Sequence, residues 1–236
     1  MSRLTVISPA YYDSLSPTLY LSDSCERLGL NLHLFGHGEP WPWLVDAKVI
    51  RLAQEIEKID SEYFLMTDAG DSFILDDEET IMMKFHASGA SVLVSAEKKC
   101  WPNPSLANHY AQVMSPWRYL NSGGYIGSKA ALLSLLRAMR DCPRPSWMQA
   151  QRSRDWMNDQ FLMSLLFVAG YPIQLDTHCK IFQCMGDSEH WEFEWRDGRL
   201  WNERMTCYPS ILHFNGHAPG IEEAYGRRFA LDAACQ

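Results

Sequence analysis

YFLMTDAGD, residues 63–71, decides how the chain is expected to fold. The run up to Thr67 is short, apolar and unbroken, which is typical of a strand buried on both faces of a parallel sheet. Two aspartates follow it, with Gly70 between them. In open α/β sheets, ligands collect outside the carboxyl ends of the strands. We therefore expect Asp68 and Asp71 to lie at the ligand-binding edge of a sheet.

Strands and helices are expected to alternate on both sides of this stretch. Hydrophobic spacing predicts helices at 11–28, 47–59, 76–88, 129–140 and 155–169. Further strands are predicted at 3–8, 31–35, 91–95, 125–127, 173–175 and 210–214. This alternation favours a mainly parallel sheet flanked by helices, with mixed strand order in the less regular second half. We expect an α/β fold and a single domain over residues 1–236.

The composition is that of an acidic globular protein. The chain has 236 residues, of which 47% are hydrophobic, and this is enough for one sizeable core. The net charge of −8 disfavours a protein whose main task is to coat a phosphate backbone. A local basic groove would have to come from the arginines between residues 137 and 154.

The cysteines and the apolar segments bear on the compartment. The seven cysteines are scattered and form no CxxC pair, which indicates reduced thiols rather than a zinc site or a disulfide framework. The N-terminal segment lacks the long apolar region of a signal peptide, and no run approaches the roughly 18 apolar residues that span a membrane. We expect a soluble, cytoplasmic protein whose oligomeric state the sequence does not determine.

Asp68 and Asp71 can direct two carboxylates at one point in space, because Gly70 between them allows a tight turn. Hard oxygen ligands with no cysteine or histidine nearby suit Mg²⁺ or Mn²⁺, which commonly bridge carboxylates and substrate phosphates. A turn in which the aspartates cap the next helix explains the same spacing. The chain has no GxxxxGK[ST] loop, no complete GxGxxG and no GxSxG, so phosphate binding would depend on the metal and a few cations.

Further polar clusters stand near the ends of predicted elements, at residues 95–102, 121–125, 158–160 and 213–217. Residues 121–125 are expected to form a glycine-rich turn that leads into a strand. Structural explanations compete with functional ones. The helix dipole alone favours Asp159 in a first turn, and an isolated histidine at a strand end, such as His213, is more often structural than a ligand.

The polar clusters occur in the same order as in a known family. The segments are TDAGD (67–71), SAEKKCWP (95–102), RYLNSGGYIG (118–127), NDQF (158–161), LDTHCKIFQ (175–183) and HFNG (213–216). Together they resemble the glycosyltransferase domain of lysyl hydroxylases and the related collagen glycosyltransferases, over most of the chain. The resemblance implies a GT-A-type fold, a divalent metal that is usually Mn²⁺, and a UDP-sugar donor.

The resemblance also implies roles for particular residues. Asp68, Asp71 and His213 match the family's metal ligands. Asp159 matches the end of the family's acidic stretch that faces the acceptor and the sugar. From the chemistry, Asp159 is the first candidate for the catalytic base, with binding of the sugar hydroxyls as its alternative role. Glu97 is the second candidate, with bonding to backbone amides near the strand end as an equal alternative. Residues expected to bind donor or acceptor are Thr67, Lys48 as a phosphate contact, Trp41 in a loop near the nucleotide, Trp101 and Asn121 beside the sugar, Gln160, and Asn215 and Gly216 at the diphosphate.

The chain departs from the family pattern at several positions. The family often carries an aromatic residue where this chain has Gly70, so the nucleobase would have to stack elsewhere, on Tyr11, Tyr12 or Trp41. The acidic stretch before Gln160 is longer in the family, and a lysine expected after the Asn-Gly pair is missing. We expect the domain to stand alone, without a dioxygenase domain after it, and an acceptor other than collagen to be allowed.

These features predict a metal-dependent glycosyltransferase, a hexosyl- or pentosyltransferase, that moves a sugar to a hydroxyl of a protein, glycan or modified nucleobase. One alternative is an enzyme that glycosylates hydroxylated bases in DNA; the arginines of 137–154 favour it and the charge of −8 disfavours it. A second alternative is a sugar-nucleotide-binding protein that has lost catalysis. The sugar, and inversion or retention at its anomeric carbon, are not determined by the sequence.

Overall fold

The central feature of the computed structural model is a six-stranded sheet. The structure describes residues 3–14, 18–40, 46–143, 158–196 and 198–229. The strand order is β2-β1-β3-β6-β5-β7. All strands run parallel except β6, which is antiparallel to both of its neighbours. The bounds are β1 Leu4–Pro9, β2 Asn31–Phe35, β3 Tyr63–Thr67, β5 Val92–Glu97, β6 Tyr119–Ser128 and β7 Gln174–Leu175.

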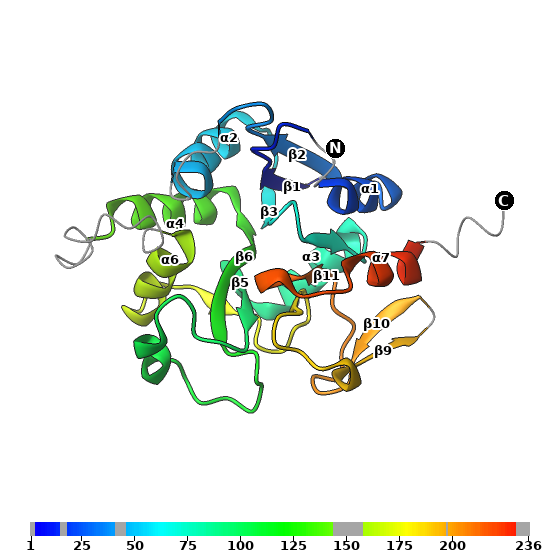
Figure 1. Cartoon of the computed structure of the whole chain (residues 1–236). Coiled ribbons are helices and arrows are strands. Elements are labelled where there is room, and N and C mark those ends of the chain that lie inside the picture. Colours follow the sequence, from blue (N-terminus) through cyan, green and yellow to red (C-terminus); the bar gives the residue numbers. More distant parts are fainter. Residues whose placement is uncertain (1–2, 15–17, 41–45, 144–157, 197, 230–236) are drawn as a thin grey trace.

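The helices cover both faces of this sheet (Figure 1). They are α1 Leu19–Arg27, α2 Leu52–Lys58, α3 Glu78–Ser88, α4 Lys129–Asp141, α6 Asp159–Val168 and α7 Ile221–Phe229. On β3, Phe64 and Met66 pack in one core with α2, α4 and α6, whereas Leu65 packs in another with α1 and α3. Because successive side chains of a strand point to opposite faces, a strand between two helical layers is apolar at every position.

A second, three-stranded sheet has the order β4-β11-β8. It consists of β4 Ser72–Ile74, β11 Ile211–His213 and β8 Phe182–Cys184. Strand β11 is antiparallel to β4 and parallel to β8, with His213 opposite both Ser72 and Cys184. A hairpin of β9 Phe193–Arg196 and β10 Arg199–Asn202 lies between β8 and β11 in the chain. The small sheet thus brings a late segment of the chain against the turn that follows β3.

Short helical turns complete the described elements. A π-helical turn, η2 Asp46–Arg51, leads directly into α2, and the 3₁₀ turns are η3 Pro104–His109, η5 His190–Glu192 and η6 Asn215–His217. The longer helices begin at side-chain caps, as predicted for Asx and Ser residues at such positions. Asn158, for example, accepts a hydrogen bond from the backbone N–H of Phe161 at 2.7 Å and so starts α6.

The predicted fold class is confirmed, since the structure is an α/β fold with a mixed, mainly parallel sheet flanked by helices. The strands at 31–35 and 63–67 have the predicted bounds. The turn predicted at 121–125 is wrong, because these residues lie within β6. Their glycines meet close neighbours instead: a Cβ at Gly124 would lie 2.6 Å from Cδ1 of Phe182. Glycine in a strand therefore marks close packing here.

Two properties of the described residues bear on the compartment. None of their helices combines the length and the apolar character needed to cross a membrane. Their six cysteines, at 25, 100, 142, 179, 184 and 207, are all free.

Candidate active site

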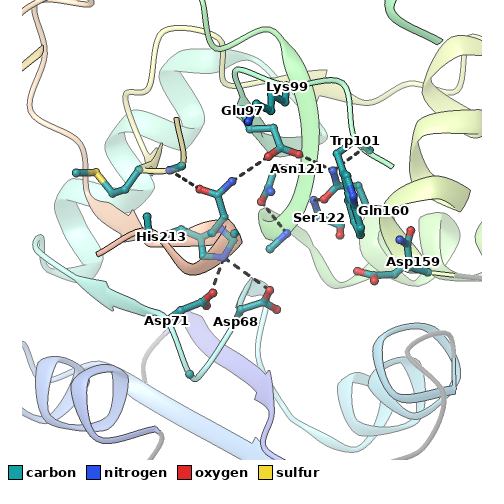
Figure 2. Close-up of a pocket in the computed structure, with 18 of the residues that line it drawn as sticks. Asp68, Asp71, Glu97, Lys99, Trp101, Asn121, Ser122, Asp159, Gln160 and His213 are labelled. Atoms are coloured by element: carbon teal, nitrogen blue, oxygen red, sulfur yellow. Dashed lines mark hydrogen bonds and ion pairs between the residues drawn. The ribbon is translucent and has the colours of Figure 1, made fainter. Parts of the chain in front are cut away.

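A cavity of about 1210 Å³ opens at the carboxyl ends of the central strands. Its walls come from the ends of β1, β5 and β11, from the segments after β1, β3, β5, β8 and β11, from η2, from the first half of β6 and from the first turn of α6. Figure 2 shows Asp68, Asp71 and His213 on one side, and Trp101, Gln160 and Asp159 on the other. The predicted site residues that line the cavity are Lys48, Asp68, Asp71, Glu97, Trp101, Asn121, Asp159, Gln160, His213, Asn215 and Gly216.

Asp68, Asp71 and His213 form a triad suited to a metal ion. One ligand atom from each residue lies within 4.8 Å of the others. His213 Nε2 is 3.4 Å from Asp71 Oδ1 and 3.7 Å from Asp68 Oδ2. The side chain of His213 is only 5% exposed, whereas that of Asp71 is 42% exposed. The Asp71 carboxylate is therefore accessible from the cavity, while the imidazole is buried. Carboxylates and imidazoles are both common ligands of divalent metal ions in proteins.

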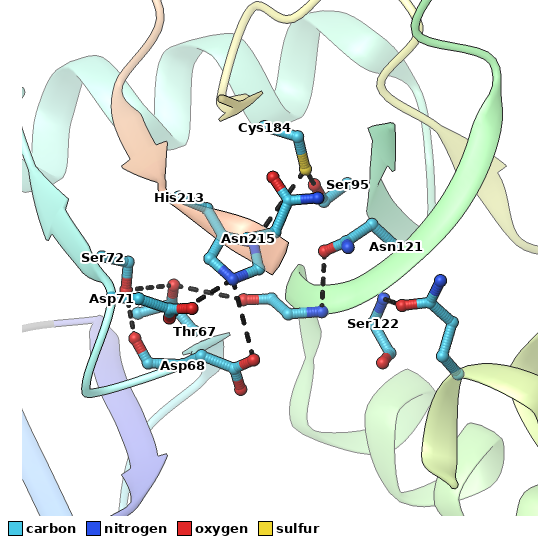
Figure 3. A network of polar contacts seen from close by, with 12 residues as sticks. Thr67, Asp68, Asp71, Ser72, Ser95, Asn121, Ser122, Cys184, His213 and Asn215 are labelled. Carbon is cyan, nitrogen blue, oxygen red and sulfur yellow. Dashed lines mark hydrogen bonds and ion pairs between the residues drawn. The ribbon is translucent and has the colours of Figure 1, made fainter. Parts of the chain in front are cut away.

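The turn that carries the aspartates is held by buried hydroxyl groups (Figure 3). Ser72 Oγ donates to the carbonyl of Asp68 and lies 2.9 Å from Thr67 Oγ1. The Asp68 N–H donates to the carbonyl of Gly123 at 3.1 Å, which ties the turn to β6. Thr67 is fully buried, so its hydroxyl supports the turn and does not reach a ligand.

Two glycines of the site leave room for specific side chains. A Cβ at Gly123 would lie 2.0 Å from Cε1 of His213, so the imidazole lies directly against the backbone of β6. A Cβ at Gly70 would lie 2.7 Å from the phenol oxygen of Tyr12, which also lines the cavity. The backbone of Gly70 is not in the left-handed region, so the need for glycine there is one of space.

Lys48 links the two sides of the cavity. Its Nζ lies 2.5 Å from Asp68 Oδ1 and 3.7 Å from Asp159 Oδ2. Burial alone would lower the pKa of Lys48, but the carboxylates of Asp159 and Asp68 outweigh it and raise the pKa, so the ammonium stays charged. The other oxygen of Asp68, Oδ2, faces His213. Lys48 and a cation at the triad can therefore use different oxygens of one carboxylate.

Glu97 ties three elements together at the back of the cavity. Its Oε1 accepts from Gln160 Nε2 at 2.6 Å, and its Oε2 accepts from Asn215 Nδ2 at 2.9 Å. The orientation of both side-chain amides is fixed, because flipping either one would lose a second hydrogen bond. Gln160 Oε1 accepts from the Ser122 N–H at 3.1 Å, and Asn215 Oδ1 accepts from the Gly186 N–H at 2.8 Å. Both oxygens of Glu97 are therefore needed as acceptors.

Asp159 is in a different situation. It is 4% exposed, and its Oδ2 has no hydrogen-bond partner among the described residues. Burial raises the pKa of this carboxyl, and the nearby Lys48 ammonium works in the opposite direction. A buried carboxylate with a raised pKa, one of whose oxygens makes no hydrogen bond among the described residues, has properties suited to a general base.

The remaining predicted residues differ in what the structure shows of them. Trp101 is 54% exposed at the cavity, and Asn121 Oδ1 accepts from the N–H of Gly123 at 3.0 Å. Tyr11 is buried, with its ring in edge contact with Phe35, so it cannot stack on a ligand in the cavity. Trp41 lies outside the described residues.

Some cavity residues were missed by the sequence reasoning. Lys99 lies within the SAEKKCWP segment and pairs with Asp187 at 2.5 Å, and both line the cavity. Asp187 belongs to a stretch, 185–188, that follows the KIFQ segment and carries no motif of its own. Only the position of Asp187 after β8, beside β11, could have identified it as a cavity residue. The sequence did not predict β8, so this signal was missed.

Comparison with known proteins agrees with the geometry. A family model described as the PLOD GT domain matches residues 12–220. Procollagen-lysine,2-oxoglutarate 5-dioxygenase of Drosophila melanogaster is 32% identical over 70% of this chain and 23% of its own length. The multifunctional procollagen lysine hydroxylase and glycosyltransferase LH3 of Homo sapiens is 25% identical over 91% of this chain and 30% of its own length.

Two viral proteins are also similar. Uncharacterized protein R699 of Acanthamoeba polyphaga mimivirus is 26% identical over 82% of this chain and 42% of its own length. The chain thus spans less than half the length of each of these three relatives. The crystal structure of a glycosyltransferase involved in glycosylation of the major capsid of PBCV-1 has a TM-score of 0.56 at 13% identity, over 95% of this chain and 98% of that one. This likeness shows a shared fold.

The contact of His213 with Gly123 leads to a test of the triad. We expect Gly123→Ala to push the imidazole away from the aspartates and to weaken Mn²⁺ binding by about tenfold or more, the range seen when support of a metal ligand is lost. Titration of Mn²⁺ followed by electron paramagnetic resonance measures the affinity. Gly226→Ala, on a helix with no atom within 4 Å of the added Cβ, is the control and should bind Mn²⁺ normally. Unchanged affinity in Gly123→Ala would contradict the assignment of His213.

Proposed function

The chain belongs to the PLOD GT domain family, a family of glycosyltransferase domains, and from that premise we propose that it transfers a sugar from a nucleoside-diphosphate sugar to a hydroxyl group with the help of Mn²⁺ or Mg²⁺. The observation that carries the proposal is the convergence of Asp68, Asp71 and His213 in the cavity. A cation bound there would offset the negative charge that develops on the diphosphate as the glycosidic bond breaks.

The chain's own cations and amides support a diphosphate at this place. Lys48 remains charged beside the triad, and the exposed Lys99 ammonium stands at the cavity wall. Asn215 and Gly216 follow His213 directly and line the same cavity. Since the described part of the cavity has no glycine-rich phosphate loop, these groups and the cation would together bind the diphosphate.

We propose Asp159 as the general base that takes the proton of the acceptor hydroxyl. Its Oδ2 makes no hydrogen bond among the described residues and faces the Lys48 ammonium at 3.7 Å, whereas both oxygens of Glu97 accept from amides of fixed orientation. Glu97 is better suited to position Gln160 and Asn215. Trp101, exposed at the same side of the cavity, offers an apolar face to a sugar ring.

Both sheets contribute to the cavity, which supports treating residues 1–236 as one glycosyltransferase domain. For the acceptor we favour a hydroxyl of a protein or glycan, by analogy with the relatives whose names mention procollagen lysine and a capsid protein. Of the arginines at 137–154, Arg137 and Arg140 pair with Glu57 and Asp141, and the others lie outside the described residues. A UDP-sugar donor and a cytoplasmic location stay predictions from the sequence.

The first test is a screen of sugar nucleotides with and without Mn²⁺. A ligand of the folded state raises the melting temperature, and turnover releases free sugar or nucleoside diphosphate. We expect at least one donor to give both signals only with the metal, and Asp71→Ala to abolish metal-dependent hydrolysis. Glu57→Ala, a change of an exposed carboxylate that does not line the cavity, is the control. Undiminished turnover in Asp71→Ala would refute the metal assignment.

The second test separates the two candidate bases. Asp159→Asn should lower kcat by about 100-fold or more, the usual contribution of a general base. Because burial raises the pKa of Asp159, the wild-type rate should fall on the acid side at a higher pH than an ordinary aspartate would give. In Glu97→Gln, the new side-chain NH₂ would face the NH₂ of Gln160 or of Asn215, both of which are fixed. This variant should raise KM for the sugar nucleotide but keep the fall in rate on the acid side of the pH profile. Loss of the limb in Glu97→Gln, with turnover retained in Asp159→Asn, would reverse the assignment.

The third test concerns the nucleobase. Tyr12 lines the cavity beside Gly70, and we propose that its ring is the surface on which the base stacks. Tyr12→Ala should weaken binding of the nucleoside diphosphate by about tenfold or more, since stacking contributes about 1–3 kcal/mol per base. Binding of inorganic pyrophosphate with Mn²⁺ is the internal control and should not change. Equal affinity of both proteins for the nucleotide would exclude Tyr12.

A further inference from the structure

The two ring nitrogens of His213 face different partners. Nε2 points to the carboxylates of Asp71 and Asp68. Nδ1 lies 3.9 Å from Cys184 Sγ, within hydrogen-bonding range for sulfur. A neutral imidazole carries one proton, and only the nitrogen without it can bind a metal. A cation on the carboxylate side therefore requires the proton of His213 to be on Nδ1.

We propose that Cys184 is a positioning residue that holds His213 in this tautomer, with the Nδ1–H directed at the sulfur and the Nε2 lone pair directed at the cation. The inference rests on the proposed function, because it presumes a cation at the triad. Cys184 belongs to none of the sequence motifs and does not line the cavity. It contacts the imidazole at Nδ1, not at the nitrogen that faces the carboxylates.

The surroundings of Cys184 fix its sulfur in place (Figure 3). The residue is fully buried at the end of β8, directly opposite His213 in the parallel pair with β11. Ser95 Oγ, on β5, lies 3.1 Å from the sulfur. The carbonyl of Cys184 accepts from Trp117 Nε1 at 3.0 Å and from Gln183 Nε2 at 2.8 Å, so the backbone is anchored as well.

The imidazole is therefore enclosed on three sides. Cys184 stands behind Nδ1, the bare backbone of Gly123 covers the ring at Cε1, and the two aspartates stand in front of Nε2. A ring rotated by half a turn about the Cβ–Cγ bond would place Cδ2 toward the sulfur and Cε1 toward the aspartates, so a nitrogen would make neither contact. The parallel register of β8 and β11, which pairs Cys184 with His213, is what makes the thiol available as a partner.

The thiol does not serve as a fourth ligand. Its contact is with Nδ1, and the contacts of both carboxylates are with Nε2, on the opposite edge of the ring. Partners of this kind orient a ligating histidine, and their loss typically weakens metal binding by about 10–100-fold. Sulfur is a weak acceptor, so we expect an effect near the lower end of that range.

The test compares Mn²⁺ affinities of the full chain by electron paramagnetic resonance. Cys184→Ala should bind Mn²⁺ about tenfold more weakly than wild type. Cys184→Ser retains an acceptor and should recover most of the affinity, whereas a residue needed only for packing would lose it in both variants. Cys179→Ala removes another fully buried thiol of the same apolar cluster and is the matched control, with unchanged Mn²⁺ affinity. Melting temperatures of all variants show which of them fold.

A spectroscopic reading tests the tautomer directly. In the protein loaded with Zn²⁺, a diamagnetic substitute, nitrogen-15 spectra of the histidine rings should show the proton of His213 on Nδ1. A proton on Nε2, or Mn²⁺ affinity in Cys184→Ala within twofold of wild type, would overturn the inference and leave the proposed function standing. If the wild-type protein binds no divalent cation, the proposed function fails, and this inference fails with it.

Discussion

The pairing of β4 with β11 is the constraint on which the site depends. Strand β4 begins at Ser72, directly after the aspartate turn, and its partner β11 ends at His213, which stands opposite Ser72. Without this antiparallel pair, Asp68 and Asp71 would be two carboxylates in an edge turn, and turn formation alone would explain them. The pair places a buried imidazole beside them. This arrangement is the one that the proposed metal site requires.

The electrostatics of the cavity follow from the same arrangement. The carboxylates of Asp68, Asp71, Glu97, Asp159 and Asp187 line it, against the ammonium groups of Lys48 and Lys99. Such an excess of negative charge repels a diphosphate unless a cation is present. Lys48 offsets part of it by bridging the two sides, and Glu97 is engaged by two neutral amides. A cation at the triad, where the family resemblance expects the metal, would offset the rest of this charge.

The sequence predicted the elements that are determined locally. The unbroken apolar run at 63–67 predicts a buried strand because both of its faces meet helices, and the polar residues after it predict the cavity edge. The β4–β11 pair could not be predicted this way, since it joins segments about 140 residues apart and each strand has only three residues. Residues 121–125 were misassigned because glycines that signal turns in isolation serve here to admit His213 and Phe182. Cys184 carried no signal at all, because its relevance comes from the register of β8 on β11.

The glycines of the site also bear on how its specificity is distributed. Gly123 admits the ring of His213, Gly186 lies against the amide of Asn215, and Gly70 lies against the phenol of Tyr12. In each case a functional side chain occupies the space that a Cβ would fill, so the two positions cannot change independently. At position 70, the same reasoning explains why this chain has a glycine where the family often has an aromatic residue. An aromatic side chain there would fill the volume that Tyr12 occupies, and a glycine there is tolerated because Tyr12 reaches across from the segment after β1. With the role proposed for Tyr12, the ring that stacks on the nucleobase would come here from the segment after β1 rather than from position 70, while Asp68 and Asp71 keep the same place.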